Sequence, residues 1–261
     1  MPTALVGHTG FVGGTLLAQS SFDDLYNSKN IESIAGKRYD LVVCAGMPAE
    51  KWKANQQPEA DHQNTERLMA ALGQVSADRF VLISTVDVYA TPVEVDEDTP
   101  IDDAVLQPYG LNRHRLETFV AERFPAHAIV RLPGLFGAGL KKNFLFDMLR
   151  SGESAWTDHR SRFQFYDMSR LWDDLETTLR QNLSLVNFAT PPVEVAEIAR
   201  RCYGREFTNE TNNPPVRYDM RTRFGRQFGA AGDYLYSADE CFERISKFVV
   251  NERARIERSS A

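Results

Sequence analysis

Short runs of apolar residues alternate along this chain with longer segments whose apolar residues recur at helical spacing. The clearest apolar runs span residues 4–6, 39–46, 79–85 and 128–137. Runs this short, without a helical period, are typical of strands buried on both faces. Between two of them, Leu68, Met69, Ala71 and Leu72 form one apolar helix face. The alternation predicts an α/β fold, a parallel sheet wound on both sides by helices.

The remaining elements are predicted from weaker patterns and from capping residues. Further strands are expected over 22–27, 163–168 and 185–188. Ser169 is expected to cap a helix over 170–180, and Gly204 to end a helix over 193–203. Ser237 and Glu240 have the spacing of a capping box, which predicts that a final amphipathic helix starts there.

Three glycines follow the first predicted strand at regular spacing. Residues 7–13 read Gly-His-Thr-Gly-Phe-Val-Gly, and helix-forming residues come next. A glycine turn lets backbone N–H groups approach a pyrophosphate closely, and the helix that follows points its positive dipole end at the same phosphates. The sequence therefore predicts a dinucleotide-binding turn, with cofactor contacts from Gly7, Thr9, Gly10, Phe11, Val12 and Gly13.

The length, net charge and cysteine content of the chain exclude several classes of protein. The 261 residues suffice for one α/β domain with a small lobe, and the net charge of −6 leaves no electrostatic footprint for nucleic acid. No apolar run is long enough to span a bilayer, and no signal segment is recognised, so a cytoplasmic protein without membrane partners is expected. Cys44, Cys202 and Cys241 are scattered, which indicates free thiols rather than a disulfide framework or a metal site.

Two further motifs follow buried strands. The strand over 79–85 runs into Thr85-Val86-Asp87-Val88-Tyr89, and Pro108-Tyr109-Gly110 opens a segment that contains Arg113 and Glu117. The spacing of four places residues 109 and 113 on one face of a helix.

Together with the glycine turn, these motifs resemble the extended short-chain dehydrogenase/reductase superfamily, the NAD-dependent epimerase/dehydratase family. The resemblance covers nearly the whole chain and is strongest at 4–14, 81–89, 107–117 and 129–137. It implies a doubly wound, Rossmann-like sheet with a small C-terminal substrate lobe. The expected division is a nucleotide-binding core over 1–133 with 163–203, a substrate lobe over 134–162 and 204–236, and a C-terminal helix over 237–261.

The resemblance implies a catalytic set of Thr85, Tyr109 and Arg113. Thr85 would hydrogen-bond a substrate carbonyl, and Tyr109 would act as general acid in reduction and general base in oxidation. Arg113 stands where the family carries a lysine. Its permanent charge would lower the pKa of Tyr109 and hold the cofactor ribose, but it cannot relay a proton.

Cofactor and substrate contacts follow from the same resemblance. Asn27, Ser28 and Lys29 end the second strand without a carboxylate, which favours NADP over NAD. The small residues Ala45 and Gly46 would let the nucleotide pass over the third strand, and Leu132 would lie near the nicotinamide. Asp87 and Asn143 are the expected substrate-binding residues, and the substrate would be a nucleotide sugar.

Some positions depart from the family pattern and leave alternatives open. Val86 replaces the acidic residue of sugar dehydratases, which argues against dehydration. Ala90 and Gly134 replace a glycine and an asparagine. A reductase and an epimerase use the same residues, so both stay open. The alternatives to an enzyme are an NAD(P)-binding sensor or scaffold without turnover, and a flavin-binding or purely structural protein. The resemblance also implies a homodimer.

Overall fold

The computed structural model describes residues 2–260, which form two compact units. The first unit contains the chain up to residue 91, then 97–132 and 171–187. The second contains 92–96, 133–170 and the chain from 188 onwards. The segment 163–203, expected in the core, is thus divided, because only 171–187 belongs to the first unit.

A six-stranded sheet forms the centre of the first unit. Its strand order is β10-β6-β4-β3-β1-β2, and every neighbouring pair is parallel. The fold class predicted from the apolar runs is confirmed. The strands are β1 (Thr3–Val6), β2 (Asp24–Tyr26), β3 (Arg38–Cys44), β4 (Ser76–Thr85), β6 (His127–Leu132) and β10 (Leu185–Asn187).

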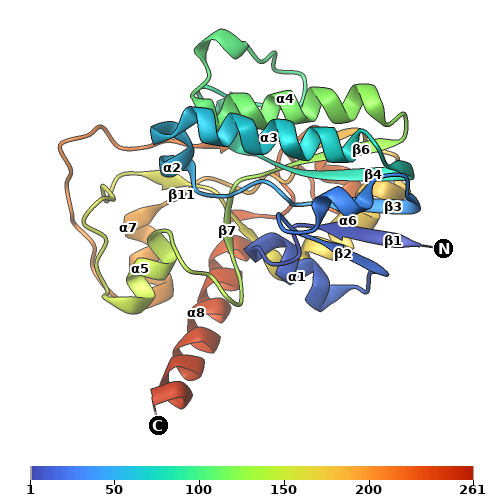
Figure 1. Cartoon of the computed structure of the whole chain (residues 1–261). Helices are drawn as coiled ribbons and strands as arrows, with labels where there is room; N and C mark the ends of the chain where they lie inside the picture. The colour runs from blue at the N-terminus through green and yellow to red at the C-terminus, as the bar shows by residue number, and fades with distance from the viewer. Residues whose placement is uncertain (1, 261) are drawn as a thin grey trace. The chain divides into compact units, whose positions relative to one another are not determined.

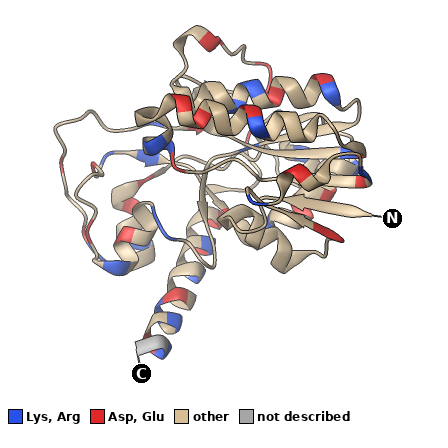
Figure 2. Ribbon diagram, in the orientation of Figure 1, with Lys and Arg blue, Asp and Glu red and all other residues tan. Residues whose placement is uncertain are grey.

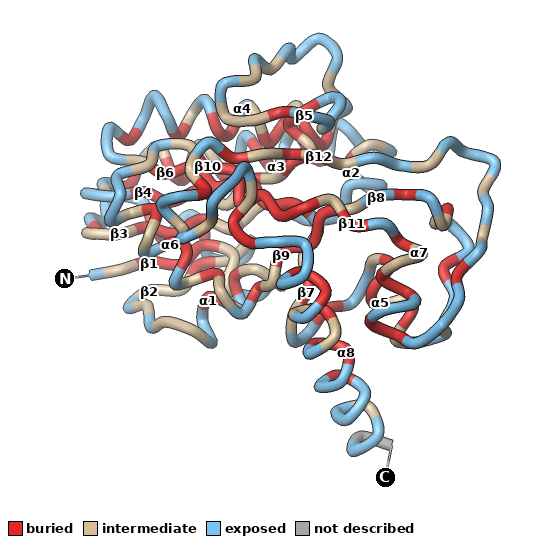
Figure 3. Tube along the Cα trace, turned by 180° about the vertical axis from the view of Figure 1, so that it is seen from behind, coloured by how far each residue is buried: buried red, intermediate tan, exposed pale blue. Residues whose placement is uncertain are grey.

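Helices cover both faces of this sheet (Figure 1). The helices α3 (Pro58–Leu72) and α4 (Pro108–Arg123) lie side by side on one face, and α1 (Phe11–Gln19) and α6 (Leu171–Arg180) lie on the other. The strands are largely buried, as Figure 3 shows. Phe80 of β4 stacks on Phe124 at the end of α4, with ring centroids 4.2 Å apart. Burial of such aromatic surface is what ties α4 to the sheet.

Short elements complete the first unit. They are α2 (Lys51–Gln56) and the 3₁₀ turns η1 (Ile31–Ile34), η2 (Val86–Val88) and η3 (Asp103–Val105). On the exposed faces of α3 and α4, acidic and basic residues are mixed (Figure 2). This mixture differs from the single-sign basic patch that a nucleic-acid backbone attracts.

The second unit contains three two-stranded sheets. Their pairings are β11 (Val193–Glu194) with β8 (Arg162–Phe163), β12 (Asp219–Met220) with β5 (Val93–Val95), and β7 (Gly134–Phe136) with β9 (Phe165–Asp167). The segment 128–137, predicted as a strand and a turn, instead contains two strands, divided at Pro133, which has no N–H for a sheet. β7 then pairs with β9 instead of continuing β6.

The helices of the second unit are α5 (Phe144–Arg150), α7 (Val195–Ile198) and α8 (Ala238–Ser260), with η4 (Met168–Arg170), the π-helical turn η5 (Ala199–Tyr203) and η6 (Gly225–Phe228). The predicted helix over 193–203 begins later, because residues 193–194 pair as a strand, and it ends at Gly204, which has a positive φ of 66°. Ser237 and Glu240 exchange the two hydrogen bonds of a capping box before α8, as predicted. Within residues 2–260, no helix combines the length and apolarity needed to cross a membrane.

Candidate active site

Three loops leave the sheet of the first unit at the same edge. Val6 of β1 lies opposite Tyr26 of β2 and Cys44 of β3 in register. Because the strands are parallel, the segments that follow them emerge together. The glycine turn 7–13, the loop 27–29 and the small residues 45–46, all expected to bind the cofactor, are brought together at the carboxyl ends of the strands. Ligands of open α/β sheets bind at this edge.

Two of the three glycines are required by the packing of the turn. Gly7 has a φ of +88°, and a Cβ there would lie 2.3 Å from the carbonyl oxygen of Ala45. A Cβ on Gly13 would lie 2.1 Å from the carbonyl oxygen of Gly7. A Cβ on Gly10 would meet nothing closer than 3.4 Å. Gly7 and Gly13 therefore let the turn fold tightly, whereas Gly10 leaves space on its open side.

The beginning of α1 suits a phosphate group. Gly10 is the N-cap residue, no side chain caps the helix, and the first turn carries no acidic residue. Thr9 and Gly10 are exposed. The first N–H groups of α1 and the positive end of its dipole thus face outward without a competing carboxylate, which is the arrangement that binds a pyrophosphate.

The loop after β2 has one basic neighbour that the sequence pattern did not reveal. Arg67 of α3 donates to the carbonyl oxygen of Ser28 at 3.0 Å and also pairs with Glu32. Lys29 is exposed, and its backbone N–H donates to Asn27 Oδ1. Lys29 and Arg67 are therefore two basic residues at the loop that follows β2. The sequence pattern could not indicate Arg67, because only the packing of α3 brings it to this loop.

Helix α4 packs directly on the segment that follows β4. A Cβ on Gly110 would lie 2.1 Å from the carbonyl oxygen of Asp87, so only glycine allows this approach. Thr85 ends β4 opposite Leu132 of β6, and its hydroxyl oxygen accepts a hydrogen bond from the N–H of Asp87 at 3.2 Å. Since Tyr109 precedes Gly110, the structure brings together the segments that carry Thr85, Asp87 and Tyr109.

Helix α2 also contacts Tyr109 and Asp87. Asn55 of α2 accepts a hydrogen bond from the N–H of Tyr109 at 3.0 Å. Lys51 of the same helix pairs with the Asp87 carboxylate at 2.6 Å. Neither α2 residue was predicted to belong to the site, because nothing in the local pattern marks them.

Arg113 is buried, and two of its three guanidinium nitrogens form hydrogen bonds. Its guanidinium lies 3.7 Å from the centroid of the Tyr109 ring. It donates to Asp61 of α3 at 2.5 Å and to the carbonyl oxygen of Pro48 at 2.5 Å. Its Nε is the one guanidinium nitrogen without a partner among the residues that the structure describes. The spacing of four residues on one helix correctly placed Tyr109 and Arg113 together, whereas the sequence pattern did not indicate Asp61.

The environment of Tyr109 reverses the expected direction of its pKa shift. Burial raises the pKa of its hydroxyl above the ordinary value of 10.0. The charge of Arg113 lowers the pKa, as predicted, but burial has the larger effect and the net direction is upward. Tyr109 is therefore protonated at neutral pH, rather than biased towards ionisation.

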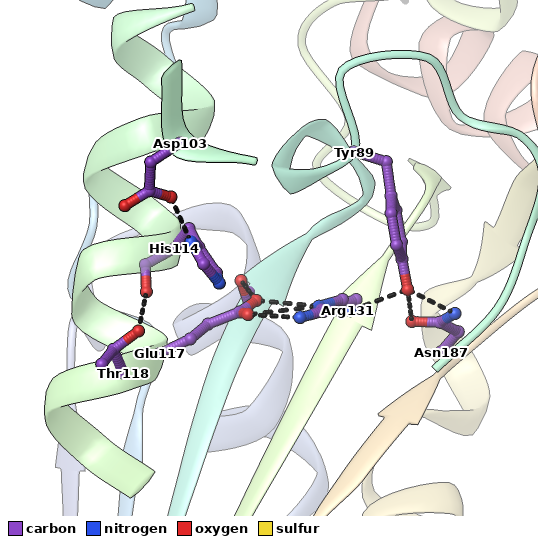
Figure 4. Close-up of polar contacts among 8 residues, drawn as sticks. Tyr89, Asp103, His114, Glu117, Thr118, Arg131 and Asn187 are labelled. Carbon is purple, nitrogen blue, oxygen red and sulfur yellow. Dashed lines mark hydrogen bonds and ion pairs between the residues drawn. The ribbon is translucent and has the colours of Figure 1, made fainter. Parts of the chain in front are cut away.

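A buried polar network supports the same region (Figure 4). Glu117 of α4 accepts hydrogen bonds from Ser84 of β4 and from Arg131 of β6. Arg131 also donates to the hydroxyl of Tyr89 at 2.7 Å, and Asn187 of β10 contacts that hydroxyl at 3.1 Å. The network links α4, which carries Tyr109, to the three strands β4, β6 and β10. The motifs pointed to Tyr89 and Glu117, but not to their partners.

Asn143 belongs to the second unit, where it caps α5. Its Oδ1 accepts a hydrogen bond from the N–H of Phe146 at 3.2 Å, and its amide donates to the carbonyl oxygen of Leu135 at 2.9 Å. Its φ of 125° lies in a region that side chains seldom adopt. The residue thus ties the start of α5 to β7, and its predicted role in substrate binding stays a prediction.

The parallel sheet, the glycine turn and the Tyr109 helix define a dinucleotide-binding enzyme fold of the short-chain type. A family model agrees: the chain belongs to the NAD dependent epimerase/dehydratase family, whose model matches residues 22–155, just over half of the chain. The expected family, and with it a nicotinamide-dependent class of enzyme, is confirmed. The match begins after the glycine turn, so the turn is independent support. A search of curated proteins gives no match.

Solved structures share the fold over almost their whole length. The dTDP-4-dehydrorhamnose reductase of Bacillus anthracis, solved with NADP, has a TM-score of 0.74 at 16% identity, covering 96% of this chain and 99% of the other. MoeE5, solved with UDP-glucuronic acid and NAD, has a TM-score of 0.75 at 18% identity, covering 98% and 100%. The UDP-glucose 4-epimerase of Thermotoga maritima, solved with UDP-glucose, has a TM-score of 0.68 at 15% identity, covering 98% and 99%.

Proposed function

We propose that the protein transfers a hydride between NADP(H) and a secondary alcohol or ketone of a nucleotide sugar. The observation that carries the proposal is the close packing of Gly110 against Asp87, which brings Tyr109 beside the segment of Thr85 at the edge where the glycine turn lies. The family membership and the reductase and epimerase among the similar structures support it.

Each residue has a distinct task in this proposal. The glycine turn and the N-terminus of α1 hold the pyrophosphate, and Lys29 holds the additional phosphate of NADP. A bound nicotinamide supplies or accepts the hydride. Thr85 donates a hydrogen bond to the substrate oxygen, and Tyr109 gives a proton to it or takes one from it. Asp87, at the same edge, lies within the substrate-binding part of this site.

Binding is tested first, by calorimetric titration of the full-length protein with NADP, NAD and ADP. The proposal predicts tight binding of NADP and weaker binding of NAD. A preference for NAD would keep the fold and overturn the choice of cofactor. Binding of neither dinucleotide would mean that the glycine turn is structural, and the proposed activity would fall with it.

Turnover is tested with Tyr109→Phe and Thr85→Val. Tyr109→Phe removes only the hydroxyl, so we expect loss of at least about a hundredfold in kcat with unchanged cofactor affinity. Thr85→Val removes one hydrogen bond to the substrate and lowers kcat/KM. Full activity of Tyr109→Phe on a 4-keto nucleotide sugar would contradict the assignment of Tyr109.

We further propose that two copies associate through helices, as in the family that this chain resembles, and that the protein works in the cytoplasm. The three cysteines are free and buried, which suits a reducing compartment. Sedimentation measurements at micromolar concentration test the homodimer, and a monomer throughout would contradict it. Asn143 stays the proposed substrate contact of the second unit.

A further inference from the structure

The most informative unassigned residue is Asp61, a carboxylate buried in α3 beside the proposed active site. Only 5% of the Asp61 side chain is exposed. Its ion-pair partner Arg113 has only 4% of its side chain exposed. The amide of Asn112 donates to the same carboxylate oxygen at 2.8 Å. A buried carboxylate without compensation would cost several kcal/mol. Two donors from α4 provide that compensation here.

The same contacts fix Arg113 in one orientation. Asp61 and the carbonyl oxygen of Pro48 bind two different nitrogens of the guanidinium, which therefore cannot rotate without losing a buried hydrogen bond. One of these nitrogens also donates to the carbonyl oxygen of Tyr109 at 3.2 Å. In this orientation the planar guanidinium lies against the aromatic ring. A lysine, with its single compact ammonium, could not provide such a flat surface.

We propose that Asp61 is a positioning residue for Tyr109. It anchors Arg113, so that the guanidinium supports the face of the ring while its charge is held by a carboxylate, and the tyrosine is kept ready to donate its proton. This proposal rests on the proposed function, and it adds the direction in which the reaction runs. The site is built to deliver a proton to a substrate carbonyl rather than to take one from an alcohol.

Four charged groups act on the Tyr109 hydroxyl, from each element packed around it. Arg113 of α4 and Lys51 of α2 favour the phenolate, whereas Asp87 of η2 and Asp61 of α3 oppose it. Lys51 is paired with Asp87 and Arg113 with Asp61, so each cation is matched by a carboxylate. Burial then leaves the neutral phenol as the stable form.

In the direction of reduction, the substrate carbonyl receives one proton and one hydride. The proton leaves the phenolic oxygen of Tyr109 for the carbonyl oxygen of the substrate as the carbonyl carbon accepts a hydride. The products are an alcohol and a phenolate, and the phenolate recovers its proton from water. Oxidation would need Tyr109 as a phenolate that accepts the proton of the alcohol, and burial disfavours this form.

The test measures the ionisation of Tyr109 directly, in protein labelled with ¹³C-tyrosine, with Tyr109→Phe identifying the signal. In the wild-type protein we expect Tyr109 to be less than half ionised at pH 10.0, its ordinary pKa. In Asp61→Asn the charge of Arg113 is no longer matched, and the midpoint should fall by about one unit. Asp78→Asn is the matched control, because that exposed carboxylate pairs with Arg38 at the surface and should leave the midpoint unchanged.

Two results would overturn the proposal: half ionisation of wild-type Tyr109 at or below pH 10.0, or an unchanged midpoint in folded Asp61→Asn. If Asp61→Asn does not fold, the wild-type titration decides alone. Reduction rates of a ketone measured against pH give a second readout, because the alkaline limb should move down with the midpoint in Asp61→Asn. Failure to bind dinucleotide would refute the proposed function without changing the titration of Tyr109. The proposed function and the role of Asp61 can therefore be refuted independently.

Discussion

Glu117 and Arg131 form a buried ion pair, with Arg131 Nη2 2.6 Å from Glu117 Oε2 and about one-twentieth of each side chain exposed. Glu117 lies on the helix that carries Tyr109, and Arg131 lies on the strand beside the one that ends at Thr85. The pair therefore connects the helix of Tyr109 to the strand next to the one that ends at Thr85, and Figure 4 shows that Arg131 also contacts Tyr89.

Removing one partner of this pair should destabilise the first unit. Glu117→Gln leaves the charge of Arg131 buried and uncompensated, so we expect the free energy of unfolding to fall by about 3–5 kcal/mol. Urea denaturation followed by circular dichroism measures the change. Asp78→Asn, which breaks the exposed pair with Arg38, is the control and should cost at most about 1 kcal/mol. Equal losses in both variants would contradict a special role for the buried pair.

The three glycine positions at the start of α1 should respond differently to alanine. Gly13→Ala places a methyl group 2.1 Å from the Gly7 carbonyl oxygen, so both the melting temperature and NADP affinity should fall. Gly10→Ala has room within the protein, but its methyl group faces the predicted pyrophosphate. It should keep the melting temperature and lose at least about tenfold in affinity, or 1.4 kcal/mol.

Gly14→Ala is the matched control for this series. Its added methyl group meets nothing closer than 3.8 Å, and alanine is the better helix former by about 1 kcal/mol. It should raise the melting temperature slightly and leave affinity unchanged. Thermal melts and calorimetry of the three variants give the comparison. If Gly10→Ala bound NADP as tightly as the wild type, the predicted path of the pyrophosphate would be wrong.

The choice between NADP and NAD is expected to depend on Lys29. In Lys29→Glu, a negative charge would repel the additional phosphate of NADP, so NADP affinity should fall at least about tenfold while NAD affinity stays the same. Lys53→Glu, an equal charge change at an exposed position of α2, is the control. Calorimetric titration with both cofactors decides, and an equal loss for both would remove Lys29 from the phosphate site.

Stability should decrease in alkali because of Cys44. Burial raises the pKa of this thiol from 9.0 to about 11 in the folded protein. Below pH 9 the thiol is protonated in both states, whereas between pH 9 and 11 only the unfolded chain releases the proton. The free energy of unfolding should therefore fall through this range, by at most about 3 kcal/mol from this group.

Urea denaturation at several pH values measures this slope. Other buried tyrosines and cysteines add to it, so the informative quantity is the difference between the wild-type protein and Cys44→Ala. The variant should lose less stability between pH 9 and 11. Identical slopes would show that the thiol ionises equally in both states.

The positions of the main strands along the chain and the glycine turn were predictable because their signals are local. A buried strand needs consecutive apolar residues, and a tight turn needs glycine at particular positions, whatever the rest of the chain does. The same holds for the capping box at Ser237 and for the spacing that places Tyr109 over Arg113. Where prediction and structure differ in the elements, as at Pro133, pairing with a distant strand decided the outcome.

The sequence by itself determined the parallel α/β fold, the turn at Gly7 and Gly13, and the identity of the Tyr109 motif. Only the tertiary structure decided that Asp61 would neutralise Arg113, that Arg67 would reach the loop of Ser28, and that Glu117 would meet Arg131. These partners lie on different elements, and each pair exists only once those elements are packed on the sheet. The tertiary structure also decided the direction of the pKa shift of Tyr109, because burial is a property of the folded chain and not of any motif.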